Sequence, residues 1–348
     1  MEIMMRSPLR EQIQIIVIGA SAGGVDAIRT IVVGLPATLS AAVFVTLHIG
    51  SHKSDLPWLL GRLGTMSASH AVHGEEIRAG HIFVAPPDHH MTVESGKVCL
   101  TKGPRENMAR PAIDPMFRSA ARTYGANVIG VILTGGLNDG TAGLYEVKAQ
   151  GGLTIVQDPS DAVGASMPKS AIANVAVDYV LTVPEIAPLL VQLVAERSPA
   201  EARKGGDQAT GDSQEKGMTA QFTLNHPVAV TCPDCGGALR RSELGSLTQF
   251  SCHIGHVYTA EIMLAAQFLT MERSVEQAMR SLSERAELCR IMMEKAQEGE
   301  AISPARWQDA MSEAFDQTAP LRELLTREWI HPDGDGIVGQ GSVITDLA

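Results

Sequence analysis

The chain has 348 residues, of which 45% are hydrophobic and 19% charged, and its formal net charge is −11. This is enough apolar material for a sizeable core and favours two domains over one, while the negative charge excludes a protein that binds nucleic acid through a broad basic surface. The apolar run after Gln14 is too short for a signal peptide or a membrane span. We therefore expect a cytoplasmic protein without membrane insertion.

The first predicted element is a short buried strand at 15–18, where four β-branched residues follow one another. A glycine-rich turn comes next, and the apolar spacing beyond it predicts a helix beginning near Val25. Ser21 therefore lies between a strand and a helix. The free N–H groups and the positive dipole end of that helix point back at the turn.

A glycine-rich turn at this place has three possible interpretations, and the first is disfavoured. A dinucleotide site would need Gly-x-Gly-x-x-Gly and an acidic residue after the second strand, but the glycines fall at 19, 23 and 24 and the second strand ends in His48. The pentapeptide 19–23 instead has the Gly-x-Ser-x-Gly spacing that exposes a nucleophilic serine. A serine that merely caps the helix is the third interpretation.

From Ile15 to about Val194, predicted strands alternate with predicted helices, which favours an α/β fold with a doubly wound, largely parallel sheet. Segments 91–94 and 98–101 alternate about a Ser-Gly turn and predict a β-hairpin excursion at the sheet margin. The other expected strands are 41–47, 81–85, 128–133, 153–156 and 179–181, and helices are expected around 58–63, over 114–124 and up to Gln150.

Ser21, His48 and Asp139 each follow the carboxyl end of a predicted apolar strand. Ligands of open α/β sheets bind at that edge, so the three residues can share one crevice. His48 would act as general base for Ser21, and Asp139 would orient the imidazole. Backbone N–H groups of Ala22 and Gly136 are our candidates for holding the oxyanion. The alternatives are a hydrogen-bonded strand-end histidine and an aspartate in a turn.

These residues lie in motifs that resemble a known family. Segments 16–24, 47–48, 110–117, 131–140 and 164–169 together are similar to the catalytic domain of chemotaxis-type protein-glutamate methylesterases, the CheB-like enzymes. By position in those motifs, Ser21 matches the nucleophile, His48 the histidine and Asp139 the aspartate. The resemblance implies hydrolysis of glutamyl methyl esters on the cytoplasmic signalling helices of chemoreceptors, with deamidation of glutamine in some members, in chemotaxis or a related chemosensory pathway.

Two departures from that family pattern are visible. About fourteen residues precede the first strand, which leaves no room for an N-terminal receiver domain, so we expect no control by phosphorylation of a receiver within this chain. Gly136 stands where the best-known members have a bulkier residue. A second function class also stays open, a non-catalytic zinc-containing signalling adaptor, although an adaptor has no need of the three residues of a triad.

Arg110 precedes the predicted helix at 114–124 and is our candidate substrate-binding residue. Its positive charge would steer an acidic receptor helix toward the crevice. The alternative is a surface arginine that pairs with Asp114.

Beyond the α/β region, residues 196–226 are polar, glycine-rich and aperiodic, which predicts a flexible linker. A Cys-x-x-Cys pair then precedes a Cys-His-Ile-Gly-His segment by sixteen residues, a spacing typical of a zinc ribbon. We expect Cys232, Cys235, Cys252 and His256 to bind a structural zinc ion, with His253 as the alternative fourth ligand. A set of three cysteines and one histidine is closed, so no cofactor is expected for catalysis. Free cysteines in a small β unit are the other interpretation.

Apolar residues then recur at alternating spacings of four and three, which predicts two helices. The two seams are Val275, Met279, Leu282, Ala286, Cys289, Met293 and Ala296, and Trp307, Met311, Ala314, Thr318, Leu321 and Leu325. An antiparallel hairpin is favoured over a dimerising coil, and it is our candidate surface for a signalling partner. The predicted division is a catalytic domain at 13–195, the linker, a zinc-ribbon-like module at 227–258, the helical hairpin at 259–330 and a disordered tail at 331–348.

Overall fold

The computed structural model describes residues 13–49, 53–196, 227–296 and 303–327. Residues 197–226 of the predicted linker and the whole predicted tail lie outside these ranges. Two compact units divide between Met263 and Leu264, so the antiparallel strands after the linker belong to the same unit as the α/β sheet. The five-part division drawn from the sequence stays a prediction.

The first unit is built on a seven-stranded, entirely parallel sheet with the order β3-β4-β2-β1-β7-β8-β9. The central strands are runs of buried, mostly β-branched residues, as expected for strands covered on both faces. The strands are β1 (Gln14–Ala20), β2 (Ala41–Leu47), β3 (Ser67–His70), β4 (His81–Val84), β7 (Val128–Ile132), β8 (Leu153–Gln157) and β9 (Tyr179–Leu181).

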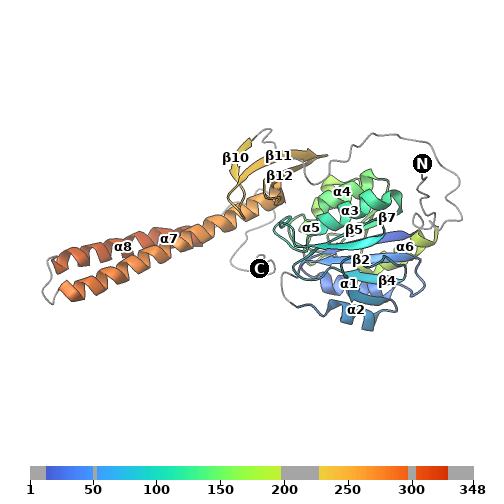
Figure 1. Ribbon diagram of the computed structural model, residues 1–348, viewed down its shortest axis with the longest axis horizontal. Helices are drawn as coiled ribbons and strands as arrows, with labels where there is room; N and C mark the ends of the chain where they lie inside the picture. Colours follow the sequence, from blue (N-terminus) through green and yellow to red (C-terminus); the bar gives the residue numbers. More distant parts are fainter. Residues whose placement is uncertain (1–12, 50–52, 197–226, 297–302, 328–348) are drawn as a thin grey trace, which may run out of the picture. The chain divides into compact units, whose positions relative to one another are not determined.

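Helices cover both faces of this sheet, and Figure 1 shows α3 and α4 on one side with α1 and α2 on the other. Side chains of β1 alternate between two cores, because Ile16 and Ile18 join one and Ile15 and Val17 the other. The predicted doubly wound fold is therefore confirmed. One core contains α1 (Gly24–Val33), α2 (Leu56–Leu63) and α6 (Val183–Glu196), and the other contains α3 (Ile113–Tyr124), α4 (Thr141–Ala149) and α5 (Ser166–Asn174).

The predicted hairpin excursion is also present. Strands β5 (His90–Glu94) and β6 (Lys97–Thr101) pair antiparallel around Ser95 and Gly96, both of which have positive φ. Met91, Val93 and Val98 pack into the core that contains α3.

A second sheet of four antiparallel strands follows the undescribed segment, with the order β10-β11-β12-β13. Its β11–β12 turn lies against the α/β part, where the Ser246 hydroxyl donates to the Asn174 side chain at 2.9 Å. Gly245 lies so close to Tyr145 that a Cβ there would come within 2.5 Å of the ring. The strands are β10 (Pro227–Thr231), β11 (Ala238–Leu244), β12 (Leu247–Cys252) and β13 (Val257–Thr259).

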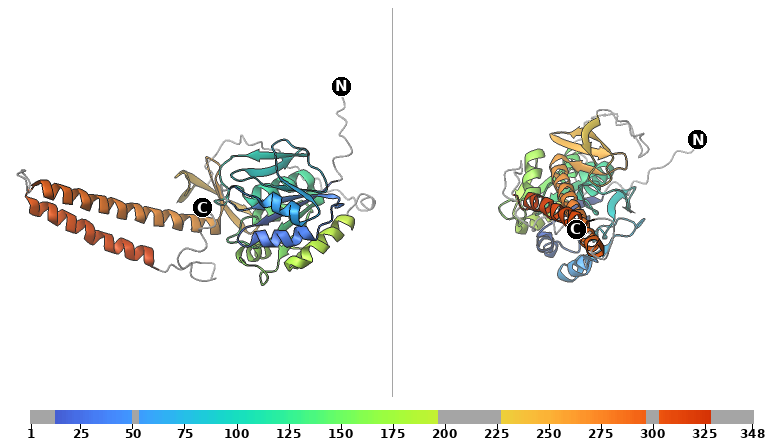
Figure 2. Two further views of the ribbon diagram at one scale, coloured as in Figure 1. Left: turned by 90° about the horizontal axis from the view of Figure 1, so that it is seen from below. Right: turned by 90° about the vertical axis from the view of Figure 1, so that its left-hand side faces the viewer.

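Two long helices, α7 (Ala260–Ala296) and α8 (Pro304–Thr326), follow β13, and Figures 1 and 2 both show them side by side. The predicted heptad seams face inward: Ala286, Cys289 and Ala314 are buried, whereas most of the remaining surface of both helices is exposed. The helical hairpin is therefore confirmed. No helix in the described ranges has the length and apolarity needed to cross a bilayer.

Candidate active site

Strand register brings Ser21 and His48 to the same edge of the sheet. Ala20 pairs with Leu47, so the next residue of each strand emerges at the carboxyl end, and the His48 amide donates to the Ala20 carbonyl at 3.2 Å. On the other side of β1, the Ser21 amide donates to the carbonyl of Thr134 at 2.9 Å. Ser21 therefore lies between the ends of β2 and β7.

The Ser21 side chain is held on a tight turn. Gly23 has φ 75°, which a glycine adopts without strain, and the Gly24 amide closes the turn on the Ser21 carbonyl at 2.8 Å. Ser21 is partly exposed, and its hydroxyl forms no hydrogen bond with any described residue. The hydroxyl is thus available to a ligand at this edge of the sheet.

Two backbone N–H groups near Ser21 are also unengaged within the described residues, those of Ala22 and Gly136. The neighbouring Gly135 amide is not available, because it donates to the Gly164 carbonyl at 2.8 Å. A Cβ on Gly135 would come 2.9 Å from the Cβ of Ser21, so the loop backbone passes directly beside the serine. These positions suit the predicted oxyanion role of Ala22 and Gly136, which stays a prediction.

His48 and Asp139 form a buried pair. The His48 Nε2 lies 2.8 Å from Asp139 Oδ2, and the two side chains are 6% and 2% exposed. A carboxylate at Nε2 fixes the proton there and leaves Nδ1 as the acceptor nitrogen of the neutral ring. His48 is therefore oriented to take a proton through Nδ1.

Asp139 is held by several other donors. Its Oδ2 accepts from the Ile113 amide at 2.6 Å, and its Oδ1 accepts from the Asn107 side chain at 2.8 Å and from the Gly140 amide at 3.0 Å. Burial alone would raise the pKa of Asp139, but the hydrogen bond and charge of His48, with the other donors, outweigh it and hold that pKa below its ordinary value. The carboxyl is thus kept ionised.

A second buried carboxyl, Asp114, lies beside this pair. It accepts from the Gly143 amide at 2.6 Å and from the Asn107 side chain at 2.8 Å. Burial, and then the negative charge of Asp139, raise the pKa of Asp114 well above its ordinary value. Asn107 therefore spans two carboxyls of different character, a role that the sequence analysis missed.

Comparison with known proteins assigns the chain to a family. The family model described as CheB methylesterase matches residues 16–190, which is half of the chain. The chain belongs to the CheB methylesterase family. The family assignment confirms the predicted enzyme class, protein-glutamate methylesterase.

Individual relatives agree with that assignment. A protein of Leptospira interrogans is 43% identical over 181 residues, covering 51% of this chain and 93% of its own. Pseudomonas aeruginosa has a protein named protein-glutamate methylesterase/protein-glutamine glutaminase 2 that is 40% identical and covers 55% of this chain, but the match spans only 56% of that protein. The solved CheB methylesterase catalytic domain of Thermotoga maritima is 35% identical, with a TM-score of 0.50, and covers 52% of this chain and 98% of its own.

Within the CheB methylesterase region, Arg110 comes shortly before α3 in the chain, and its side chain is already engaged. Its guanidinium donates to Asp88 Oδ1 through Nε at 2.9 Å and through a terminal nitrogen at 2.6 Å, and to the Gly103 carbonyl at 2.9 Å. The hydrogen bond from Arg110 lowers the pKa of Asp88. The alternative pairing with Asp114 is wrong, because that carboxyl is held by Asn107 and Gly143. A substrate role for Arg110 stays a prediction.

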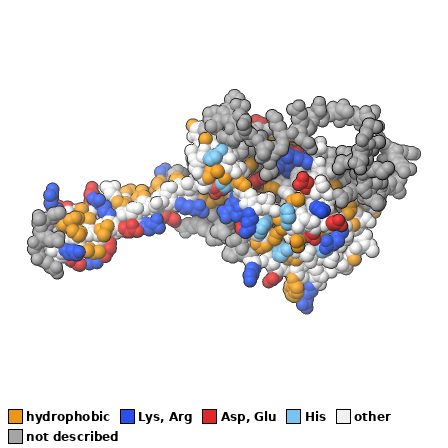
Figure 3. All heavy atoms as spheres, viewed as in Figure 1, with side chains coloured by type: hydrophobic (Ala, Val, Ile, Leu, Met, Phe, Trp, Pro, Cys, Tyr) orange, Lys and Arg blue, Asp and Glu red, His pale blue; other side chains and the backbone are white. Residues whose placement is uncertain are grey.

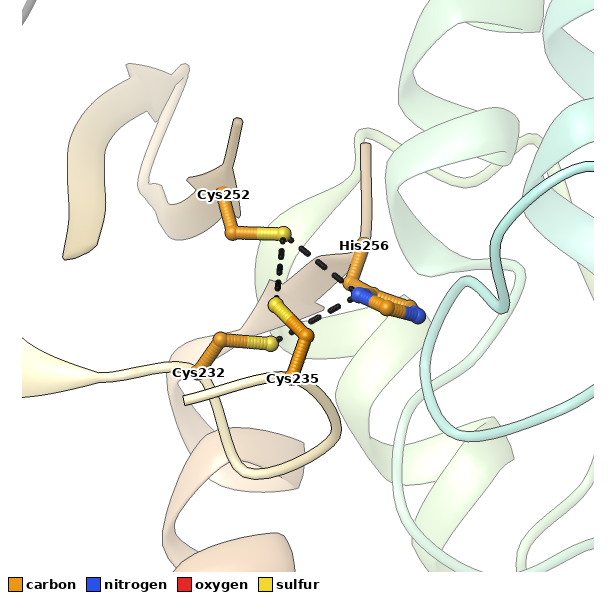
Figure 4. A group of neighbouring side chains, drawn as sticks. All are labelled: Cys232, Cys235, Cys252 and His256. Carbon is orange, nitrogen blue, oxygen red and sulfur yellow. Dashed lines mark hydrogen bonds between the residues drawn. The ribbon is translucent and has the colours of Figure 1, made fainter. Parts of the chain in front are cut away.

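Outside the CheB methylesterase region, the predicted metal ligands gather in one place. Figure 4 shows the three sulfur atoms and the His256 ring pointing toward one another, and all four ligand atoms lie within 4.8 Å of one another. The His256 Nδ1 is 3.4 Å from the Cys252 sulfur and 3.7 Å from the Cys232 sulfur, and the sulfurs of Cys235 and Cys252 are 3.6 Å apart. All five cysteines of the chain are free thiols.

These spacings fit a tetrahedral ion. Zinc held at about 2.3 Å from sulfur and about 2.0 Å from nitrogen separates neighbouring ligand atoms by about 3.5–3.8 Å. Asp234 lies 3.7 Å from the other nitrogen of His256, beyond hydrogen-bond distance, and accepts from the Tyr258 hydroxyl at 2.8 Å. His253 is exposed and packs against Gly237, so the cluster includes His256 in its place.

Proposed function

We propose that this chain hydrolyses glutamyl methyl esters on the cytoplasmic helices of methylated chemoreceptors, with Ser21 as nucleophile, His48 as general base and Asp139 as the orienting carboxylate. One observation carries the proposal. The buried His48–Asp139 pair lies at the edge where Ser21 emerges from β1, with free N–H groups of Ala22 and Gly136 beside it. A nucleophile, a base, its orienting group and an oxyanion site are the four parts that acyl transfer requires.

In the acylation step, the Ser21 oxygen attacks the ester carbonyl while His48 takes its proton through Nδ1. The carbonyl oxygen becomes negatively charged and is held by the N–H groups of Ala22 and Gly136. When the tetrahedral intermediate collapses, the carbon–oxygen bond to the methoxy group breaks and His48 returns the proton. Methanol leaves and a glutamyl–serine ester remains.

In the second step, water takes the place of the serine hydroxyl. His48 removes a proton from the water as it attacks the acyl-enzyme, and then returns that proton to the Ser21 oxygen. The products are the glutamate carboxylate and the free enzyme. The same sequence on a glutamine side chain would release ammonia, so deamidation needs no further residue.

We also propose that Cys232, Cys235, Cys252 and His256 hold one zinc ion in a structural role. The four-ligand set leaves no open position for water, which argues against a zinc-bound nucleophile. Support comes from the ligand spacing. The free thiols suit the cytoplasm, the location that we expected from the sequence.

The helical hairpin is proposed as a surface for a signalling partner. Large apolar side chains lie exposed on both helices, with Leu288 63% and Phe315 59% accessible, and hydrophobic atoms are visible along the hairpin in Figure 3. Single apolar residues are normal on surfaces, so the proposal rests on the presence of several large ones on the same two helices: Leu264, Leu288, Ile291 and Phe315.

The function is tested by incubating the purified full-length chain with a receptor fragment that carries radiolabelled methyl esters and following the release of methanol. A matched fragment with glutamine at the same positions reports deamidation through ammonia. We expect methanol from the first fragment in amounts equal to the esters lost. Release of neither product from any methylated receptor fragment would favour the alternative, a non-catalytic adaptor.

A further inference from the structure

A short segment joins α7 to residues 227–256, which carry the four proposed zinc ligands and which we call the metal-ligand module. This segment contacts two asparagines that adjoin Asp139. Residues 257–261, which we call the docking segment, begin directly after His256 and end in the first turn of α7. The docking segment forms hydrogen bonds with two asparagines, Asn107 and Asn138. Asn107 donates to Asp139 through its side chain, and Asn138 is the chain neighbour of Asp139.

Contacts with Asn107 use its backbone and its side chain. The Asn107 amide donates to the Val257 carbonyl at 2.7 Å, and the Thr259 amide donates to Asn107 Oδ1 at 3.1 Å. The orientation of the Asn107 side chain is fixed by chemistry, because its NH₂ group faces the two carboxyls of Asp114 and Asp139. Every hydrogen-bonding group of the side chain is thereby engaged.

Contacts with Asn138 have the same character. The Thr259 hydroxyl donates to Asn138 Oδ1 at 2.6 Å, and the Asn138 NH₂ group donates to Glu261 at 2.7 Å. Thr259 is fully buried, and Asn107, Asn138 and Asp139 are each 3% exposed or less. Water therefore does not compete easily for these bonds, and losing one would leave a buried polar group without a partner.

The loop that carries Asn107 also depends on this support. Asn107 and Met108 have φ values of 52° and 63°, a left-handed conformation that is costly for methionine. Glu106 forms a bridge to Val257 in the docking segment. Such backbone conformations persist where surrounding contacts hold them.

We propose that the docking segment is a positioning element for Asp139, and that Thr259 and Asn107 are its positioning residues. Both residues are buried and lie outside the proposed set of Ser21, His48 and Asp139. Thr259 holds both asparagines, Asn107 holds the Oδ1 atom of Asp139, and Asp139 holds His48. The catalytic domain of this chain thus obtains part of its active-site support from outside the region that matches its family. The proposal rests on the esterase function proposed above.

The test uses full-length chains with Thr259→Val, which keeps the shape and the amide bond to Asn107 but removes the hydroxyl bond to Asn138, the chain neighbour of Asp139. Thr259→Ser keeps the hydroxyl. We expect Thr259→Val to lower kcat on a methylated receptor fragment about tenfold with little change in KM, since small misplacement of a catalytic group acts on turnover. Thr259→Ser should restore most of the activity. Glu261→Ala removes one exposed acceptor and should lower kcat about twofold, whereas Glu276→Ala, an exposed α7 residue outside the docking segment, should not change it.

A spectroscopic measurement separates this proposal from the proposed function. The His48 imidazole N–H that faces Asp139 should give a low-field proton NMR resonance, which we expect to shift or weaken in Thr259→Val and to return in Thr259→Ser. A wild-type resonance and wild-type kcat in Thr259→Val, or equal damage in both variants, would overturn the proposal. If the wild-type chain hydrolyses no ester, the proposed function fails while the resonance still decides the positioning role.

Discussion

The parallel sheet and the metal-ligand module differ in how much apolar core stabilises them. In the sheet, residues 15–18 are fully buried and two continuous apolar cores lie on its faces. In the four-stranded module, fully buried apolar side chains are few among the described residues, with Leu239 and Tyr258 among them, and two of the remaining buried residues, Cys232 and Cys252, are proposed zinc ligands. A small β unit with so little core usually depends on a metal or a disulfide.

This contrast has a consequence for catalysis. Ser21 and His48 are placed by strands of the large sheet, so their positions depend on hydrophobic burial. Asp139 is placed partly by Asn107 and Asn138, which the docking segment holds through Thr259. A disturbance of the module should therefore reach the active site through the carboxylate and leave the serine in place.

The largest effect should come from Ser21→Ala. The side chain is small and partly exposed, so its loss should leave the melting temperature unchanged while methanol release falls by about 10⁴-fold or more. Turnover and thermal denaturation of the two proteins measure this. Retention of more than about a tenth of the wild-type turnover would contradict the assignment of the nucleophile.

Asp139→Asn should be almost as damaging. An amide favours the wrong imidazole tautomer, and in a comparable triad this change costs about 10⁴-fold in kcat. In addition, each carboxyl oxygen accepts from a backbone N–H group, that of Ile113 on Oδ2 and that of Gly140 on Oδ1, so the new NH₂ group must face a donor on either side. We therefore expect the free energy of unfolding to fall by about 1–3 kcal/mol. Chemical denaturation and steady-state kinetics of the purified variant test both expectations.

The pH dependence of stability tests whether the Asp139 carboxyl is ionised in the folded chain. The folded pKa of Asp139 lies below its ordinary value of 3.8, so its contribution is complete above the unfolded pKa and is lost as the pH falls through the folded value. The stability difference between wild type and Asp139→Asn should therefore be constant near neutral pH and shrink below about pH 4. A difference that grows on acidification would show that the carboxyl is not held ionised.

Removing the proposed zinc ion should have an intermediate effect on kcat. Chelation, or Cys235→Ser, should expose residues 227–263 to protease while the parallel sheet stays folded, and kcat should fall about tenfold, as for Thr259→Val. Cys99→Ser is the matched control, because Cys99 lies on β6 and outside the cluster. Full turnover in a chelated chain whose module has unfolded would separate the module from the active site.

Arg110→Ala should have the smallest effect. The guanidinium is already bound by Asp88 and the Gly103 carbonyl, so little of its charge is free to attract an acidic helix. We expect KM for the receptor fragment to rise about threefold or less, with kcat unchanged. Arg105→Ala, an exposed arginine of the same loop, is the comparison, and a much larger rise in KM for Arg110→Ala would support its predicted role in substrate binding.

Several features of the site could be predicted because they follow from local pattern. The β-branched runs predicted the central strands, and the residues that follow them, Ser21 and His48, had to emerge at one edge of a parallel sheet. Strand β3 was missed because Ser67–His70 has none of the apolar signal of a buried strand, and it occurs at the sheet edge beside β4. The four residues that spacing favoured as metal ligands, Cys232, Cys235, Cys252 and His256, also lie together in the structure, and their role as ligands stays a prediction.

The sequence by itself determined the order of strands and helices, the three residues of the candidate triad and the heptad seams of the hairpin, because periodicity and motif spacing are local properties. Only the tertiary structure decided which groups hold Asp139. Asn107 lies 32 positions before Asp139, and Thr259 lies 152 positions after Asn107, so neither distance nor pattern along the chain connects them. Their contact depends on a left-handed turn at Asn107 and on the packing of β13 against it, which arise when the folded chain buries polar groups that must find partners.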